Sequence, residues 1–183
     1  MLENGIIEHC APTLAGLKTA NMFNYKFSSI DDLFKQLQEE NQKLNEKGVY
    51  IEVLKIKHSR ALVYVYRKKM LEADLKREGT VQLLLNHGYE DNGEAKCIEQ
   101  LKQRLAEYDC FPHEIGLFLG YPLEDVIGFM EHGGKNCKCC GLWKVYGDEC
   151  ETRKLFERFK KCTKVYCRVF AEGRNIAQMT VAA

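Results

Sequence analysis

Two neighbouring runs of β-branched and aromatic residues constrain the fold of this chain more than any other feature. They are VYIEVLKIK at residues 49–57 and ALVYVYR at residues 61–67, and the three residues HSR separate them. Runs of this composition favour β-strands. The short separation predicts a β-hairpin, although not one with a two-residue turn. A sheet is therefore expected around residues 49–67.

Helical spacing precedes and follows this hairpin. A short helix is expected over residues 11–22, with Pro12 in its first turn. Ser28 or Ser29 can cap a second helix, which Gly48 can end. Helical spacing returns in three segments after the hairpin, which cover residues 68–77, 80–87 and 94–107.

The last third of the chain alternates between the two patterns. The apolar runs 114–121 and 142–146 predict short strands, and a helix opens at Pro122 between them. Asp148 with Glu151 resembles a capping box for a long helix that ends near Gly173. The sequence thus predicts one α+β domain over residues 1–183, mainly helical. Its small mixed sheet would consist of the hairpin at 49–67 and strands near 114–121 and 142–146.

Composition excludes several classes of protein. The net charge of +1 gives no overall basic field for nucleic acid, and no stretch approaches 18 apolar residues. The N-terminal segment lacks a basic region followed by an apolar run, so no secretory signal is expected. Nine cysteines in such a chain indicate a reducing cytoplasm, with free thiols or metal ligands rather than disulfides.

Residues 135–150 hold four of the nine cysteines. The spacing Cys-x-x-Cys-Gly at 137–141 is typical of a zinc knuckle, in which two thiolates point at one metal ion. No second Cys-x-x-Cys exists, so further ligands would have to come singly. Buried or spare thiols are the alternative. The candidate ligands of iron or zinc are Cys137, Cys139, Cys140 and Cys150.

A second candidate site begins at Cys10, which is expected just before a helix. A thiol at such a position feels the positive end of the helix, which lowers its pKa. Cys10, His113 and Asp125 follow the order of the papain-like thiol enzymes, so a hydrolase or transferase is one hypothesis. Against it, no glutamine precedes Cys10, and Asp125 falls inside a predicted helix. The alternative is a structural thiol.

Residues 112–131 fit the spacing of a helix-turn-helix motif. Its second helix would present Glu124 and Asp125 to DNA, and phosphates repel carboxylates. Few groups on that helix could contact base edges. A packing role for this segment is expected instead, with no nucleic acid and no membrane as partner.

Basic residues recur on the long helix predicted for the C-terminal region. Residues 153–174 carry eight basic and two acidic residues. Such a face is either merely solvated or a docking surface for an acidic partner or a phosphate-bearing ligand. The candidate partner-binding residues, on the face away from the apolar stripe, are Lys154, Arg158, Lys161 and Arg168.

Three motifs together resemble an uncharacterised bacterial family of unknown function that is found mostly in anaerobes. They are HCAPTLAG at residues 9–16, PHEIG with LGYPLEDV at 112–126, and WKVY at 143–146. The resemblance implies no catalytic residues. It implies a link to iron or redox metabolism, because genes of this family accompany those for flavodoxin and ferrous-iron transport. An acidic flavodoxin would suit the basic helix.

The leading hypothesis is therefore a thiol-rich binding or accessory protein of iron or redox metabolism. The thiol enzyme based on Cys10 is one alternative. An interaction protein without metal or catalysis is the other.

Overall fold

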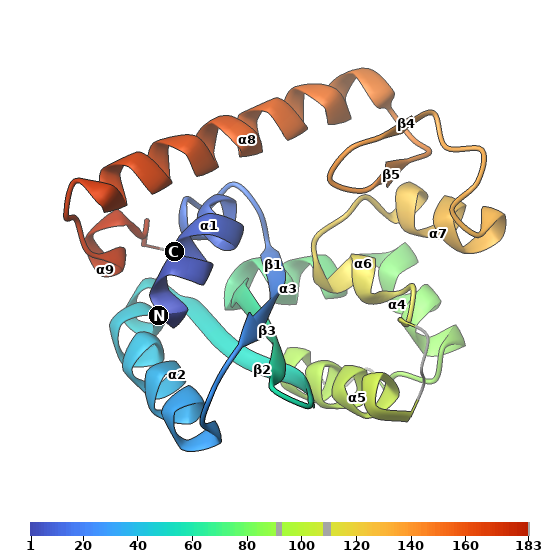
Figure 1. Cartoon of the computed structure of the whole chain (residues 1–183). Coiled ribbons are helices and arrows are strands. Elements are labelled where there is room, and N and C mark those ends of the chain that lie inside the picture. The colour runs from blue at the N-terminus through green and yellow to red at the C-terminus, as the bar shows by residue number, and fades with distance from the viewer. Residues whose placement is uncertain (91–92, 108–110, 183) are drawn as a thin grey trace.

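The predicted hairpin forms the centre of the fold, but the prediction about its turn is wrong. Lys57 pairs with Arg60, so the turn is the tight two-residue kind, made of His58 and Ser59. The computed structural model describes residues 1–90, 93–107 and 111–182, and Figure 1 shows their arrangement. Strands β2 (Val49–Lys57) and β3 (Arg60–Arg67) pair in antiparallel fashion, and β1 (Ala20–Lys26) pairs with the other side of β3. The order β1-β3-β2 places β3 in the middle.

The two faces of β3 belong to different cores. Ala61, Val63 and Val65 face one core, whereas Leu62 and Tyr64 face the other. The first, the α1-side core, is closed by helices α1 (Leu2–Leu14), α2 (Ile30–Leu44) and α9 (Ile176–Met179), with the short turn η1 (Asn45–Lys47) after α2. The second, the α5-side core, is closed by α3 (Lys68–Leu75), α4 (Glu78–Asn86), α5 (Glu94–Glu107) and α6 (Ile115–Phe118). Burial on both faces explains why β3 is a continuous apolar run rather than an alternating one.

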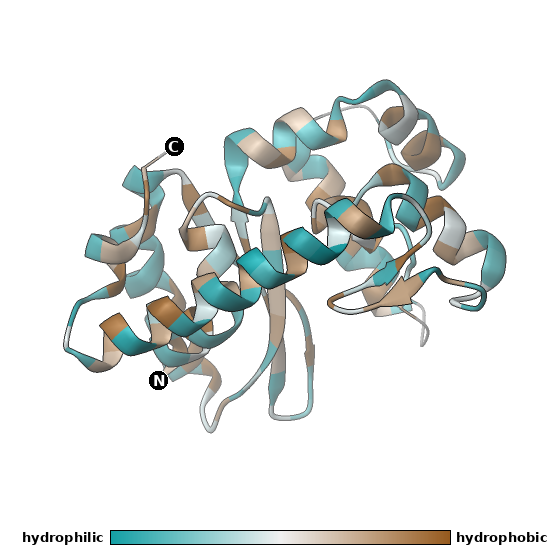
Figure 2. Ribbon diagram, turned by 90° about the horizontal axis from the view of Figure 1, so that it is seen from above, coloured by the Kyte–Doolittle hydropathy of each residue, from teal (hydrophilic) through white to brown (hydrophobic). Residues whose placement is uncertain are grey.

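The C-terminal third forms a separate small core. This core is formed by the region of the hairpin β4 (Cys139–Cys140) and β5 (Lys144–Val145) and by α8 (Glu149–Ala171), whereas Val126 of α7 (Leu123–His132) packs in the α5-side core. Phe156 and Phe159 of α8 pack on Trp143 and Val145 of this hairpin region. Further along, Tyr166 and Phe170 of α8 pack against the α1-side core. In the view from above, α8 crosses the molecule and is largely hydrophilic along its middle (Figure 2).

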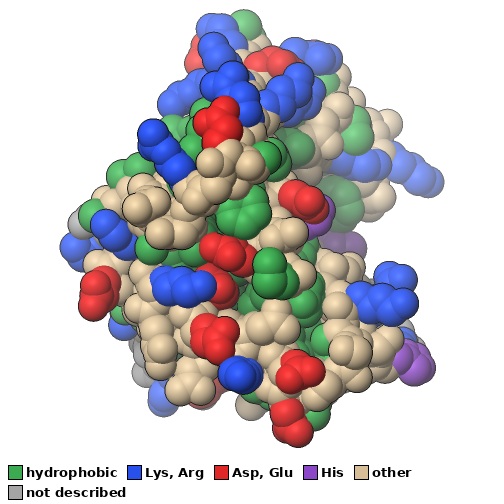
Figure 3. All heavy atoms as spheres, turned by 60° about the vertical axis from the view of Figure 1, so that its left-hand side comes forward, with side chains coloured by type: hydrophobic (Ala, Val, Ile, Leu, Met, Phe, Trp, Pro, Cys, Tyr) green, Lys and Arg blue, Asp and Glu red, His purple; other side chains and the backbone are tan. Residues whose placement is uncertain are grey.

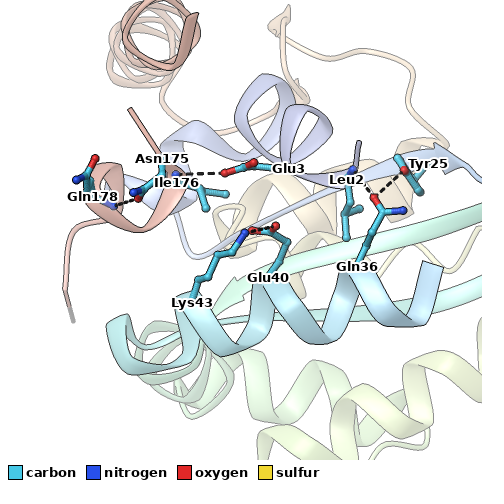
Figure 4. A network of polar contacts seen from close by, with 9 residues as sticks. All are labelled: Leu2, Glu3, Tyr25, Gln36, Glu40, Lys43, Asn175, Ile176 and Gln178. Atoms are coloured by element: carbon cyan, nitrogen blue, oxygen red, sulfur yellow. Dashed lines mark hydrogen bonds and ion pairs between the residues drawn. The ribbon is translucent and has the colours of Figure 1, made fainter. Parts of the chain in front are cut away.

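Polar contacts hold the start of α1 against α2 and α9 (Figure 4). The Leu2 N–H donates to Gln36 Oε1 over 2.9 Å, and the Ile176 N–H donates to Glu3 Oε1 over 3.3 Å. Glu40 pairs with Lys43 over 2.7 Å, and its other carboxylate oxygen is buried with no hydrogen bond to any residue that the structure describes. Burial raises the pKa of Glu40 accordingly.

The predicted fold class is confirmed, but one predicted strand, one predicted helix and the predicted type of the sheet are wrong. Residues 114–121 are not a strand: they form α6 and a turn, because a short apolar run does not distinguish a buried helix from a buried strand. The predicted helix at 11–22 is also wrong, since α1 spans Leu2–Leu14 and residues 20–26 form β1. The sheet pairs that the structure describes are all antiparallel, so the sheet is not mixed.

Other predictions are confirmed. The strand at 142–146 is β5, although only Lys144 and Val145 have strand geometry. It does not join the sheet of the hairpin as predicted, because it pairs with β4 in a separate two-stranded sheet. The caps are confirmed as well, because Ser29 accepts a hydrogen bond from the Asp32 N–H and Asp148 accepts one from the Glu151 N–H. Of the helices in the described residues, none is both long enough and apolar enough to cross a membrane.

The side chain of Arg67 connects the end of β3 to the end of α1 and to the C-terminal segment. Its Nε donates to Thr13 O over 2.6 Å, and its Nη2 donates to Leu14 O and to Val181 O over 2.7 Å each. The side chain is buried, with 3% exposed. The last carbonyls of a helix lack partners within the helix and carry partial negative charge. The buried guanidinium of Arg67 gives the last carbonyls of α1 both hydrogen-bond donors and a positive charge.

We expect Arg67→Lys to destabilise the protein by about 2 kcal/mol, because an ammonium cannot reproduce the forked contacts to three carbonyls. Urea unfolding measures the change. The matched control is Arg174→Lys, which exchanges the same residues at an exposed position and should change stability by less than about 0.5 kcal/mol. Equal effects of the two substitutions would contradict this role of Arg67.

Candidate functional site

A pocket of about 370 Å³ lies between α6, α7 and the β4–β5 hairpin. This volume is within the range of about 300–1,000 Å³ that is usual for small-molecule sites. Its walls are mainly aromatic and aliphatic side chains, with Lys144 and the Cys140 thiol among the polar groups that line it. The aromatic rings in the lining are those of Phe111, His113, Tyr121, Phe129 and Trp143.

Two glycines allow the elements around the pocket to approach one another. Gly120 has a φ of +70°, and a Cβ there would lie 2.6 Å from Thr19 Oγ1. The turn between α6 and α7 therefore requires glycine for its conformation and for space. A Cβ at Gly128 would lie 2.4 Å from Cγ of Tyr146, so this glycine lets the hairpin lie directly on α7.

The aromatic rings at and behind the pocket pack in two groups, which together form its aromatic wall. The rings of Tyr121 and Trp143 stack with centroids 4.5 Å apart, and Phe156 meets Trp143 edge-on at the same distance. His113 and Phe129 form a second edge-to-face pair at 4.9 Å. Such pairs contribute about 0.5–1.5 kcal/mol each beyond the burial of their area. The wall is thus fixed before any ligand enters.

Asp125 fastens the hairpin to α7. Its Oδ2 accepts from Trp143 Nε1 over 2.7 Å, and its Oδ1 accepts from the N–H groups of Tyr146 and Gly147 over 2.7 and 2.8 Å. The residue is 2% exposed. Three donors compensate the buried charge in place of a cation. Asp125 therefore positions Trp143 in the pocket wall, and His113 is not among its recorded partners.

We expect Asp125→Asn to destabilise the protein by about 2–4 kcal/mol, because one amide oxygen cannot accept from donors on both sides and the NH₂ group would face an N–H. Urea unfolding followed by Trp143 fluorescence gives the value. Glu131→Gln removes the same charge from an exposed position on the same helix, and we expect it to be nearly neutral. An unchanged stability of Asp125→Asn would show that the hairpin does not depend on this anchor.

Lys18 lies beneath the pocket wall, with its Nζ 5.0 Å from the centroid of the Tyr121 ring. It is 6% exposed, and Nζ donates a short hydrogen bond to Ala20 O. Burial lowers the pKa of Lys18 to about 7. Burial also raises the pKa of Tyr121 to about 12.

The predicted position of Cys10 is wrong. Cys10 lies inside α1 rather than before it, and it is fully buried in the α1-side core. Burial raises the pKa of this thiol far above its ordinary value, which opposes the thiolate that a nucleophile needs. His113 and Asp125 line the pocket, whose recorded lining does not include Cys10. The structure therefore does not bring the three predicted catalytic residues together.

Lys18 makes stability depend on pH in a defined window. Its pKa is about 7 in the folded protein and 10.5 ordinarily, so unfolding takes up a proton between these values and stability rises with pH. We expect the free energy of unfolding to rise by up to about 2 kcal/mol between pH 7 and 8.5. Above pH 9.0 the raised pKa of Cys10 acts in the opposite direction, which sets the upper limit. Urea unfolding at several pH values tests this, with Lys18→Met expected to lose the slope. If the parent protein and Lys18→Met show the same change of unfolding free energy with pH, this pH dependence does not come from Lys18.

The thiols of residues 137–150 differ in accessibility. Cys139 is buried against Trp143 and Phe156, Cys137 is half-buried, and Cys140 and Cys150 are exposed. Consecutive residues of a strand point to opposite faces, which separates Cys139 from Cys140. Among the residues that the structure describes, no group of three or more His, Cys, Asp or Glu side chains could hold a metal ion. A metal role for Cys137 and Cys140 stays a prediction.

The basic residues of α8 gather on the upper part of the molecule (Figure 3). Lys154 pairs with Glu151 over 2.6 Å, and Arg168 approaches Glu172 at 4.0 Å. For Arg158 and Lys161 the structure records no ion pair among the described residues. This face is thus less basic than its sequence indicates. Docking of an acidic redox protein such as a flavodoxin on it stays a prediction.

Sequence reasoning missed the aromatic wall and Lys18. In the sequence, Trp143 belongs to a predicted strand and to the WKVY motif, and Tyr121 belongs to the run before Pro122 and to the LGYPLEDV motif, but neither segment indicates that the two rings meet. Two of the three motifs that carry the family resemblance, at 112–126 and 143–146, supply most of the pocket lining. Their convergence was the available signal, because motifs far apart in sequence can share one site.

No curated protein and no solved structure matches the chain. The predicted membership in a family of unknown function is confirmed, whereas its bacterial and anaerobic distribution stays a prediction. The family model that matches residues 6–180 is described as "Protein of unknown function (DUF3793)", and the chain belongs to this family.

Proposed function

We propose that this protein is a binding protein that holds a planar, largely apolar ligand in the pocket between α6, α7 and the β4–β5 hairpin. The observation that carries the proposal is the preformed aromatic wall of Tyr121 and Trp143, which flanks a pocket of about 370 Å³. Flat rings stack well on such a wall. The role would be that of an accessory protein rather than of a thiol enzyme.

The chemistry of the lining supports this class of ligand. Among the described residues that line the pocket, the carboxylate is that of Asp125, which already accepts from three donors, so it is not free to bind a cation or to act as a base. Lys144 Nζ likewise donates to Gly134 O. His113 is exposed at the pocket, and no hydrogen bond of its ring is recorded among the described residues, so the ring is free to orient one polar group of a ligand.

The thiol of Cys140 supports a ligand connected with redox metabolism. Cys140 is exposed and belongs to the pocket lining, and Cys137 is partly accessible in the same segment. A soft, polarisable thiol beside an aromatic wall suits a redox-active planar ligand. The association with iron or redox metabolism that the family resemblance implies agrees with this class.

The single tryptophan of the chain makes the proposal directly measurable, because Trp143 lies in the pocket wall. We expect riboflavin, a neutral planar redox-active probe, to bind with a dissociation constant in the micromolar range by calorimetry. Binding should quench Trp143 fluorescence to saturation at the same stoichiometry. Phe129→Ala removes part of the wall and should weaken binding about tenfold, which corresponds to about 1.4 kcal/mol.

The experiment has two controls, one a variant and the other a second ligand. Phe34→Ala makes the same substitution at an exposed position on α2 outside the pocket and should leave the affinity unchanged. 2-Naphthol is planar and neutral but is not a redox cofactor analogue. Binding of 2-naphthol alone would support a planar ligand and contradict the redox class. Saturable binding of neither probe, with both variants folded, would contradict the proposal.

A further inference from the structure

A row of three cations crosses the sheet at the tip of the β2–β3 hairpin. Arg60 on the central strand β3 is directly opposite Lys26 on β1 and Lys57 on β2. Side chains of residues that pair across strands lie on the same face of the sheet. The three positive charges therefore stand next to each other on one face.

The next row extends this cluster into a pocket. Leu62 is opposite Asn24 and Lys55 in the same register. A pocket of about 260 Å³ opens at these two rows. Its lining consists of Lys57 and Arg60 from the first row, all three residues of the second row, His58 of the turn and the exposed Phe111, whereas Lys26 is not in the recorded lining. Phe111 also lines the pocket between α6, α7 and the β4–β5 hairpin, here called the aromatic pocket, so the two sites are neighbours.

Within residues 1–90, 93–107 and 111–182, no carboxylate forms an ion pair with Lys26, Lys57 or Arg60. Lys55 uses its ammonium on the carbonyl of Leu105. On α8, by contrast, neighbouring glutamates pair with several of the basic residues. Like charges directly opposite each other across strands are destabilising.

Protection of the sheet edges does not account for this arrangement. Charged side chains on edge strands discourage pairing with other chains, and Lys26 and Lys57 are on edge strands. Arg60, however, is on the central strand, which has no free edge to protect. His58, next to Lys57, has a φ of +55°, which is usual for a central residue of a two-residue hairpin turn. The repulsion within the row of cations is therefore explained neither by edge protection nor by the turn.

We propose that this tip is a binding site for the phosphate group of a small phosphorylated ligand. Arg60 would bind the phosphate through two parallel hydrogen bonds, and Lys26 and Lys57 would add charge from either side. Phe111 offers an apolar wall for the part of the ligand next to the phosphate. The site is independent of the ligand proposed for the aromatic pocket.

The test uses inorganic pyrophosphate as the probe, with calorimetry at constant ionic strength set by sodium chloride. We expect saturable binding at one site. The double variant Lys57→Gln with Arg60→Gln should weaken it at least tenfold. The matched control is Arg158→Gln with Lys161→Gln on α8, which removes the same two charges and should change the affinity less than twofold.

Stability separates loss of binding from loss of fold. Without ligand and at low salt, removal of the repulsion at the tip should leave the tip variant at least as stable as the parent in urea unfolding. An equal loss of pyrophosphate binding in the two double variants would overturn the proposal in favour of general charge attraction. Absence of binding beyond the effect of chloride would also overturn it. Tight binding of single-stranded RNA without any binding of pyrophosphate would do the same, since the tip would then be a nucleic-acid contact.

Discussion

The buried guanidinium of Arg67 is the contact on which the rest of the structure depends. It occurs where the central strand ends, where α1 ends and where the C-terminal segment returns to the first helix. Three carbonyls surround it instead of a carboxylate, so the buried charge is compensated by dipoles that the fold itself provides. At the other end of the same strand, Arg60 has an exposed side chain and no such carbonyl cage. One strand thus carries a structural arginine and an accessible one.

Local signals explain what the sequence could predict. The hairpin, α2 and α8 have strong composition, periodicity or caps, and these are effects of neighbours along the chain. Residues 20–26, ANMFNYK, contain no β-branched residue, and they form a strand because β3 offers its free side to them. The sequence predicts Pro12 in the first turn of a helix, but it lies in the last turn of α1. Proline there cannot donate a backbone hydrogen bond to the preceding turn, and the tertiary packing of the buried Pro12 overrides this local cost.

The candidate site was less predictable because its parts are distant in sequence. The order of Cys10, His113 and Asp125 imitated an enzyme, but order along the chain does not determine which side of a sheet a residue occupies. Trp143 meets Tyr121 only because Asp125 holds the hairpin on α7. The density of cysteines was visible in the sequence, whereas their accessibility depends on strand alternation and on packing against α8.

The buried charges and the exposed charges of this protein respond differently to salt. Arg67, Lys18 and Asp125 are buried and hydrogen-bonded to backbone groups or to an indole. Mobile ions cannot screen such contacts well. The row of Lys26, Arg60 and Lys57 is exposed, so its repulsion weakens with salt and so does its attraction for an anion. Binding that weakens with salt is therefore the signature that distinguishes the tip of the sheet from the pocket between α6, α7 and the β4–β5 hairpin, whose apolar wall owes little to charge.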